Sequence, residues 1–453
     1  MKNKYILFSF ILIFLCSCGK DDNLSPLDIE TAEDSVTIPQ NSEIEIFIFS
    51  NDANIPSHGQ LSISNPTRGI ALRIDPNSTP NNPSDDAILY KAKANEIGED
   101  SFQYTICNAS GHCKTETVNV FITSNSNVVF NLETVPFQKL SEYQFFQGAL
   151  KELRPEFGVL PYDLNSPLFS DYAKKKRFIW MPNNTKATYL TDNVSLNFPS
   201  GTILIKNFYY ENVLPDNETK IIETRLMIRK NEDWIFANYV WNDEQTEALF
   251  DLNGSTTDIQ WQENGEINTV QYRIPSGAKC LTCHKKQEIP EPIGPKPRNL
   301  NLVYAYSDGS ENQLTQLVNV GYLENTLPST IESLPNYNDT DENLDLRVRA
   351  YLDVNCAHCH SEETHCSYRP MRFDFIRTED FTNIGVCVDP ETNIGFDLGQ
   401  IVAPGDARKS VLHFRLNATE PSIRMPLLGR SLVHKEGVQL IEDWINGLTN
   451  DCN

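Results

Sequence analysis

Alternating apolar and polar positions dominate the first quarter of the chain and predict short, half-buried strands. In Ser101–Cys107 the apolar residues Phe102, Tyr104 and Ile106 alternate with polar ones, and Thr115–Ile122 has a similar pattern. A period of two residues is that of a strand with one face in a core. The strands expected here are Glu43–Phe49, Gly69–Asp75, Ala87–Ala94, Ser101–Cys107 and Thr115–Ile122. Turn residues separate them, so residues 30–124 are predicted to form an all-β, Ig-like sandwich.

A second β-rich stretch covers residues 131–275, after the polar linker Ser124–Asn127. Its expected strands are Arg177–Met181, Thr202–Tyr210, Ile221–Arg229 and Asp233–Trp241. Four of the five tryptophans lie in this stretch, within apolar runs, which places them in a core rather than on a sugar-binding surface.

Helical spacing replaces alternation after about residue 276. The helices expected are Asn312–Tyr322, Leu344–Asn355 and Lys435–Leu448. Residues 276–335 are taken as one segment and 336–453 as a mainly α domain. The fold class expected is therefore multidomain: an all-β sandwich, a β-rich middle domain and a mainly α C-terminal region.

The N-terminus has the pattern of an export signal. Met1–Lys4 is basic, and the apolar run Tyr5–Leu15 is too short to span a bilayer. Leu15–Gly19 resembles a bacterial lipobox with Cys18 as the lipidated residue, so residues 1–17 are read as a lipoprotein signal peptide and 18–29 as a tether. The alternative is a plain secretory signal. We expect an exported lipoprotein of the cell envelope, held in the outer membrane on either its periplasmic or its surface-exposed side.

The charge balance restricts the partners. Among 453 residues, 38 Lys and Arg stand against 61 Asp and Glu, a net charge of −23. Nucleic acid and anionic lipid are recognised by basic surfaces, so neither is expected to bind by charge. An acidic surface favours a basic redox partner instead.

Two Cys-x-x-Cys-His motifs carry the chemistry: Cys280–His284 and Cys356–His360. This is the attachment sequence of a c-type haem. Two cysteines one helical turn apart form thioethers with the haem vinyl groups, and the following histidine is placed under the iron. We therefore predict two haem c groups, bonded to Cys280, Cys283, Cys356 and Cys359, with His284 and His360 as axial ligands.

The same cysteines permit two other interpretations. A structural zinc site built from both Cys-x-x-Cys pairs needs deprotonated thiolates. A thioredoxin-like redox pair needs a βαβ context, which the pattern lacks.

The second motif has a candidate for its sixth ligand. A helix is expected to run directly into Cys356, and the last helix to cross it. Met425 lies 65 residues past His360 in the loop segment Arg424–Leu427. A loop methionine is a usual distal ligand and raises the reduction potential, so Met425 is predicted to bind the second iron.

The first motif lacks such a candidate. The 71 residues between His284 and Cys356 contain no Met and no His. The candidates elsewhere are Met371, His413, His434, His365 and His358. An open position permits small-molecule chemistry such as peroxide reduction, whereas a filled one leaves electron transfer. The alternatives stay open, and no catalytic residue is assigned.

The remaining cysteines suggest disulfides, since an exported chain meets an oxidising compartment. Cys107 and Cys113 flank a turn. Cys366 and Cys387 are the best second pair, with Cys452 as a competitor for either partner.

Two resemblances add to these readings. The segments Asp100–Thr105 and Thr117–Val120 resemble the last hairpin of bacterial Ig-like and cadherin-like modules. Residues 135–450 resemble a family of exported bacterial two-haem c-type cytochromes; the matching segments are Pro167–Tyr172, Glu223–Leu226, Cys280–His284, Arg349–His360, Arg424–Gly429 and Trp444–Ile445. Ile293–Leu300 is similar to the Gly-Pro-x-Leu segment whose carbonyl orients the proximal histidine in many cytochromes c.

What the family resemblance implies is haem binding and electron transfer. The N-terminal module lies outside this resemblance, and we interpret it as a spacer. The alternatives are a peroxidase-like haem enzyme that uses an open first haem, and a cell-surface lipoprotein that binds glycans or mediates adhesion. The resemblance supplies neither a substrate, an electron donor or acceptor, nor an oligomeric state.

Overall fold

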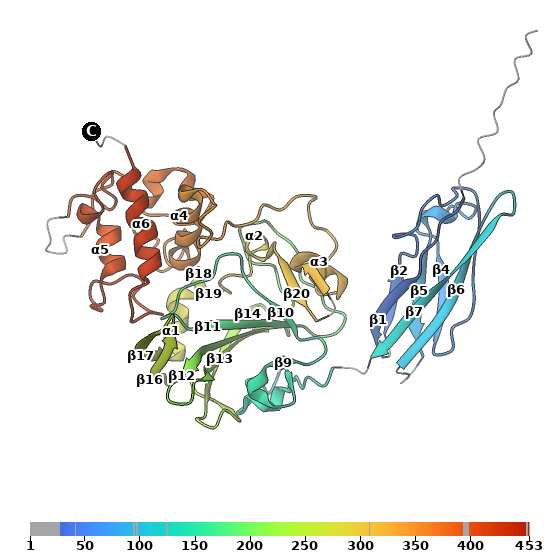
Figure 1. Ribbon diagram of the computed structural model, residues 1–453, viewed down its shortest axis with the longest axis horizontal. Coiled ribbons are helices and arrows are strands. Elements are labelled where there is room, and N and C mark those ends of the chain that lie inside the picture. Colours follow the sequence, from blue (N-terminus) through green and yellow to red (C-terminus); the bar gives the residue numbers. More distant parts are fainter. Residues whose placement is uncertain are drawn as a thin grey trace, which may run out of the picture. The chain divides into compact units, whose positions relative to one another are not determined.

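The computed structural model describes residues 28–449 and 452, except 41, 94, 95, 97, 124, 125, 308 and 393–397. The chain forms two compact units, residues 1–125 and 126–453 (Figure 1). The signal peptide and Cys18 lie outside the described residues. Within them, we find no helix with the length and hydropathy that crossing a bilayer demands.

The N-terminal unit is a sandwich of two sheets. The larger sheet has the order β1-β7-β6-β3, with β1 (Asp34–Pro39) parallel to β7 (Cys113–Thr123). The other has the order β2-β5-β4. The remaining strands are β2 (Glu43–Ile46), β3 (Gly59–Ile63), β4 (Gly69–Ile74), β5 (Ala87–Ala92) and β6 (Gly98–Asn108). The inward residues of both sheets form one core, since alternate positions of each strand are apolar.

Two buried tyrosines and one disulfide stabilise this sandwich. Tyr104 donates a hydrogen bond to Asp52 and Tyr90 donates one to Asp100, each at 2.6 Å. A disulfide joins Cys107 to Cys113 across the β6–β7 turn.

One antiparallel sheet forms the centre of the second unit. Its path is β10-β11-β12-β13-β14-β15, and the hairpin β16–β17 pairs with β12. The strands are β10 (Leu160–Tyr162), β11 (Lys174–Trp180), β12 (Ile203–Val213), β13 (Glu218–Lys230), β14 (Asp233–Trp241), β15 (Ala248–Phe250), β16 (Ser255–Glu263) and β17 (Glu266–Ile274). Trp180, Trp234, Trp241 and Trp261 are all at least 92% buried, which confirms that they belong to cores.

Short elements surround this sheet. The strands are β8 (Phe146–Gln147), β9 (Arg154–Pro155), β18 (Lys285–Lys286), β19 (Ile289–Pro290), β20 (Val303–Tyr306) and β21 (Gly309–Asn312). The helices are α1 (Gly277–Cys283), α2 (Pro297–Leu300) and α3 (Gln313–Asn319).

Three helices gather in the last part of the same unit: α4 (Leu344–Leu352), α5 (Val411–Asn417) and α6 (Lys435–Gly447) (Figure 1). The Asn343 side chain caps α4 by accepting hydrogen bonds from the N–H groups of Asp345 and Leu346. The α6 helix packs on α4, and its Trp444 indole donates a hydrogen bond to Asp345 at 2.6 Å.

The protein is multidomain, and it is strongly β-rich, since helices make up only 18% of the structure where it is described. The expected helix Leu344–Asn355 is also shorter than predicted. The α-helix ends at Leu352, and a π-helical turn follows over Asp353–Ala357. In this turn the Asp353 side chain accepts a hydrogen bond from Lys296, and the Asn355 side chain accepts one from the Phe169 N–H.

The second disulfide differs from the favoured pair. Cys387 is bonded to Cys452, the competitor that the sequence left open, and Cys366 is a free, buried thiol. The reason is local. The Cys366 N–H donates to the Cys359 carbonyl at 2.8 Å, which holds Cys366 beside the second Cys-x-x-Cys-His motif and away from Cys387.

Candidate functional site

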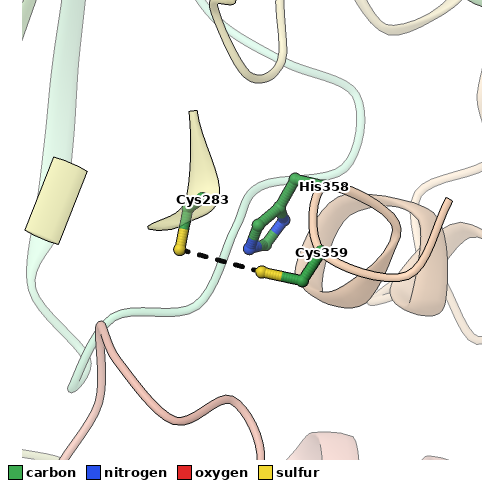
Figure 2. Close-up of side chains that lie close together, drawn as sticks. All are labelled: Cys283, His358 and Cys359. Carbon is green, nitrogen blue, oxygen red and sulfur yellow. Dashed lines mark hydrogen bonds between the residues drawn. The ribbon is translucent and has the colours of Figure 1, made fainter. Parts of the chain in front are cut away.

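The two Cys-x-x-Cys-His motifs meet in space. The sulfur atoms of Cys283 and Cys359 are 3.9 Å apart, although 76 residues separate them in the sequence. A ring nitrogen of His358 lies within 4.8 Å of both sulfurs (Figure 2). The sequence predicted each motif but gave no sign that they are neighbours.

The sheet positions the first motif. Strand β17 leads into α1, whose first residue, Gly277, donates its N–H to the Leu252 carbonyl at 2.9 Å. This short helix places Cys280 and Cys283 one turn apart on the same side. It contacts β14, and the Phe236 ring of that strand packs against the His284 ring at 5.4 Å.

A carbonyl fixes the orientation of the His284 ring. The Nδ1 atom lies 3.0 Å from the Glu291 carbonyl oxygen, which is an acceptor only, so Nδ1 carries the proton and Nε2 keeps its lone pair. Burial lowers the pKa of His284 to about 3, which keeps the ring neutral at neutral pH. The resemblance to cytochromes c predicted that the carbonyl of the Gly294–Pro295 segment would orient this histidine. The Pro295 carbonyl instead accepts a hydrogen bond from the Leu196 N–H.

The second motif continues the α4 backbone. The N–H groups of Cys359 and His360 both donate to the Cys356 carbonyl at 3.0 Å, so the motif keeps a helical turn. His360 is 9% exposed, and its ring packs against Phe373 at 5.3 Å. Burial lowers the pKa of His360 to about 4. Its Nδ1 atom has no hydrogen-bond partner among the described residues.

Met425 lies in a loop that Arg430 and Asp171 anchor. The Arg430 guanidinium donates to the carbonyl of Met425 and to four further backbone carbonyls, of Arg415, Leu416, Ala418 and Leu432. Asp171 accepts from the N–H groups of Ser431 and Leu432. The Met425 side chain is half-buried and does not line the cavity beside the first motif, whereas its neighbours Arg424 and Pro426 do.

A cavity of about 340 Å³ lies beside the first motif. Cys280, Cys283 and His284 line one part of it, and His358 lines another. Apolar side chains of the sheet complete the wall, including Leu204, Phe208, Met227 and Phe236. Nine lysines and arginines line the cavity against four aspartates and glutamates, the reverse of the balance in the whole chain.

A row of cations crosses the sheet beside this cavity. Arg177 on β11 is directly opposite Lys206 on β12, and Lys206 is directly opposite Arg225 on β13. Arg177 pairs with Asp163 and Arg225 pairs with Glu223, each at 2.5 Å. This row is not predicted from the sequence, because three residues on separate strands become neighbours only through the register of the sheet.

Lys206 stands out within this row. Its ammonium lies 5.0 Å from the centre of the Phe208 ring, and the described part of the chain offers it no ion pair. Burial, followed by the charge of Arg177, holds the pKa of Lys206 well below its usual range. Like charges placed directly opposite one another destabilise a sheet, so this arrangement favours the binding of an anion in the cavity.

The four motif cysteines differ in acidity. A hydrogen bond from the Cys359 thiol lowers the pKa of Cys283 to about 4, and the same contact raises the pKa of Cys359. Burial raises the pKa of Cys280, and it raises that of Cys356 to about 12. Of the four, Cys283 is therefore the one that most readily loses its proton.

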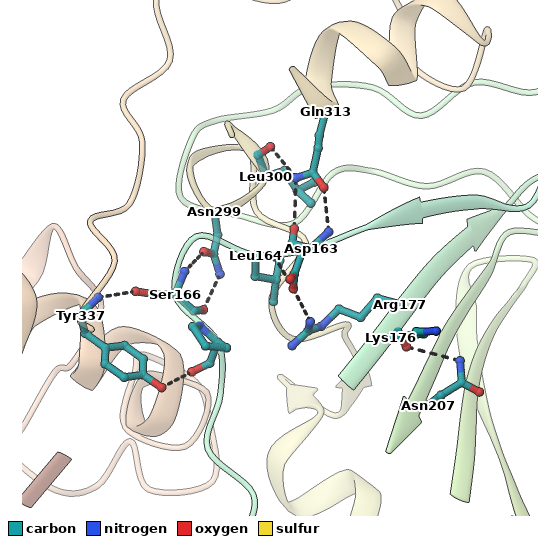
Figure 3. Close-up of polar contacts among 11 residues, drawn as sticks. Asp163, Leu164, Ser166, Lys176, Arg177, Asn207, Asn299, Leu300, Gln313 and Tyr337 are labelled. Carbon is teal, nitrogen blue, oxygen red and sulfur yellow. Dashed lines mark hydrogen bonds and ion pairs between the residues drawn. The ribbon is translucent and has the colours of Figure 1, made fainter. Parts of the chain in front are cut away.

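Residues 163–172 form a strap beside the sheet. Figure 3 shows the hydrogen bonds of its residues Asp163 and Ser166 with Gln313, Asn299 and Tyr337. Ser166 and Asn299 exchange two hydrogen bonds, and Gln313 both accepts from the Asp163 N–H and donates to the Asp163 carbonyl. Further along the strap, the Phe169 N–H donates to Asn355, one residue before Cys356. The strap therefore links the sheet to the segment that follows the first motif and to the turn that leads into the second.

Only some of the candidates for the distal ligand of the first haem line the cavity. His358 and His434 line the cavity that His284 lines. Met371 packs against the core of the helical region, His365 is exposed, and His413 faces Glu442 at 3.7 Å.

Comparison with known proteins supports the N-terminal unit alone. The family of bacterial Ig domains matches residues 23–121. Among solved structures, immunoglobulin domains 1–4 of Sidekick-1 are 8% identical, with a TM-score of 0.14 over 55% of this chain and 76% of that one. Cadherin domains 1–4 of protocadherin gamma B7 are 11% identical, with a TM-score of 0.15 over 53% of this chain and 74% of that one.

No curated protein matches the chain, and no cytochrome c family match supports haem binding. The chain thus carries an N-terminal module similar to bacterial Ig domains, followed by a unit whose role rests on its two motifs.

Proposed function

We propose that residues 126–453 carry two covalently bound c-type haems and transfer electrons, on a chain that a lipid at Cys18 anchors to the cell envelope. The observation that carries this proposal is the His284 ring. Its Nδ1 is engaged by the Glu291 carbonyl, and the described residues offer its Nε2 no hydrogen-bond partner. His284 lines a cavity together with Cys280 and Cys283. A metal-ligating histidine characteristically donates its other N–H to such an acceptor.

The residues present fit the chemistry of a haem. Cys280, Cys283 and His284 provide two thiols and one neutral imidazole at the edge of a largely apolar cavity. A haem also carries two carboxylates, and the basic lining, with Lys206 lacking an ion pair among the described residues, fits a dianionic group. The second motif offers the same donors: Cys356, Cys359 and the neutral ring of His360.

The closeness of the motifs supports electron transfer. A bound haem supplies a reversible one-electron iron couple. Since the Cys283 and Cys359 sulfurs are 3.9 Å apart, haems bonded to them would be neighbours. The hydrogen bonds of the strap to the segments that carry the motifs would limit reorganisation between the two redox centres.

The zinc reading receives less support. A structural zinc site takes four ligands around one point. Among the described residues, the cluster at the meeting point holds only Cys283, Cys359 and His358. Cys280 instead lies against the Ser276 carbonyl, and Cys356 packs against the core of the helical region.

The lipid anchor and the partner follow from the sequence. Lipidation of Cys18 tethers the chain, and the Ig-like module serves as a spacer. The acidic surface favours a basic redox partner, whose association weakens as salt screens the charges.

Single-motif variants test the haem assignment. Cys280→Ala combined with Cys283→Ala should leave one haem per chain in protein matured by a host with a haem-attachment system, and the same pair of changes at Cys356 and Cys359 should leave the other. Intact mass under denaturing conditions counts the haems. Cys366→Ala is the matched control, since this free thiol lies outside both motifs and should keep both haems. An unchanged mass in both double variants contradicts the proposal.

A further inference from the structure

The identity of the sixth ligand of the first haem decides whether its iron is open. Five residues were candidates from the sequence, and the fold leaves two of them, His358 and His434, on the cavity that His284 lines. The two rings differ in the polar neighbours of their nitrogen atoms.

His434 is held by its surroundings. Its ring stacks on Phe169 with 4.1 Å between centroids and an interplanar angle of 8°. Its Nδ1 lies 3.3 Å from the Tyr351 hydroxyl, and its Nε2 lies 3.7 Å from a Glu436 carboxylate oxygen. Both nitrogens therefore already have polar neighbours, and the ring is enclosed by aromatic side chains.

His358 is placed differently. Its Nδ1 atom is buried and has no hydrogen-bond partner among the described residues. A buried nitrogen without a partner is costly, which calls for a ligand or a metal. The ring also lies beside Cys283, the residue that binds the first haem in the proposed function (Figure 2).

The backbone of the second motif brings His358 to this place. The motif begins within a π-helical turn over Asp353–Ala357, and a ring nitrogen of His358 lies within 4.8 Å of the sulfurs of both Cys283 and Cys359. His358 therefore stands where the two motifs meet, beside a cysteine of the first motif.

We infer that His358 is the distal axial ligand of the first haem, so that a residue within one haem-binding motif ligates the iron bound by the other. This inference rests on the proposed function. It gives the first iron two histidine ligands and leaves no open position, which makes the protein an electron carrier and not a peroxidase. It also couples the two centres, because the backbone that holds the second haem sets the ligand of the first.

The test uses the full, haem-loaded protein. The pyridine absorption spectrum first counts the haems, so that loss of haem, which would contradict the proposed function, is told apart from a change of ligand. Electron paramagnetic resonance of the oxidised wild type should then show two low-spin centres, one of them with two imidazole ligands. A high-spin centre in the wild type overturns the inference.

Variants locate the ligand. His358→Ala should convert one of the two haems to high spin and allow it to bind cyanide, and added imidazole should restore the low-spin spectrum. His365→Ala is the matched control, an exposed histidine in the same loop, and should keep the wild-type spectrum. His358→Met provides a second variant if the alanine variant matures poorly, and it should replace the bis-imidazole signal with a thioether-to-iron absorption band. Two low-spin haems without cyanide binding in His358→Ala, or a high-spin haem in His434→Ala alone, overturns the inference.

Discussion

The carboxylate of Asp353 accepts a hydrogen bond from the ammonium of Lys296 at 2.9 Å, and so ties the segment after the first motif to the turn that leads into the second. Asp353 is 5% exposed, and it also accepts the Phe375 N–H at 3.1 Å. The Lys296–Asp353 ion pair therefore joins the two parts of the chain that carry the two motifs.

Asp353→Ala should lower the free energy of unfolding by about 3 kcal/mol, because it leaves the half-buried Lys296 ammonium and the Phe375 N–H without their acceptor. Chemical denaturation followed by circular dichroism measures the change. Asp243→Ala is a control, since the Asp243 side chain, which pairs with Lys220, is 90% exposed. It should change stability by less than about 1 kcal/mol. Equal effects of the two substitutions would show that Asp353 does not join the two segments.

Met425→Ala should lower the reduction potential of one haem and remove its thioether-to-iron absorption band, because methionine ligation favours the reduced iron. Redox titration followed by absorption spectroscopy measures both effects. Met371→Ala is the matched control, since Met371 packs against the core of the helical region. If the band persists in Met425→Ala and disappears in Met371→Ala, the roles of the two methionines are exchanged.

At a pH at which Lys206 is protonated, Lys206→Met should lower the potential of the proposed haem in the cavity. The oxidised iron carries one more positive charge than the reduced iron, so a nearby ammonium disfavours oxidation, and its removal stabilises the oxidised state. Lys174→Met serves as the comparison, because Lys174 is 46% exposed and pairs with Glu211. Its removal should leave the potential nearly unchanged, since solvent and salt screen exposed charges. A potential that does not respond to Lys206→Met places this lysine away from the redox centre.

Lys175 predicts a pH dependence of stability. Burial, reinforced by the charge of Arg177, lowers the pKa of Lys175 to about 7. Between pH 7 and 10 the unfolded chain then binds more protons than the folded chain, so stability rises with pH, by at most about 1.4 kcal/mol per pH unit. Lys175→Met should reduce this slope, whereas Lys176→Met, at the exposed neighbouring position, should keep it. Denaturation curves at pH 6, 7, 8 and 9 make the comparison, and identical slopes in all three proteins would refute it.

The sequence predicted what depends on local pattern. Period-two alternation located β6 and β7, and helical spacing located α6 to within one residue at its end. The tryptophans were correctly assigned to cores, because each stands within an apolar run.

What the sequence did not predict depends on register and on contacts between distant segments. Arg177, Lys206 and Arg225 form a row only because three strands pair at those positions. Three further contacts depend on how loops pack. They are the approach of the Cys283 and Cys359 sulfurs, the hydrogen bond of His284 to the Glu291 carbonyl, and the disulfide between Cys387 and Cys452. Spacing along the chain carries no information on such approaches.

The measurement that bears most directly on the account is the pyridine absorption spectrum of the wild-type protein matured by a host with a haem-attachment system, taken together with its intact mass. Two covalently attached haems per chain are expected. A colourless protein, whose mass equals that of the processed and lipidated chain alone, would contradict the account and leave the two motifs without a role.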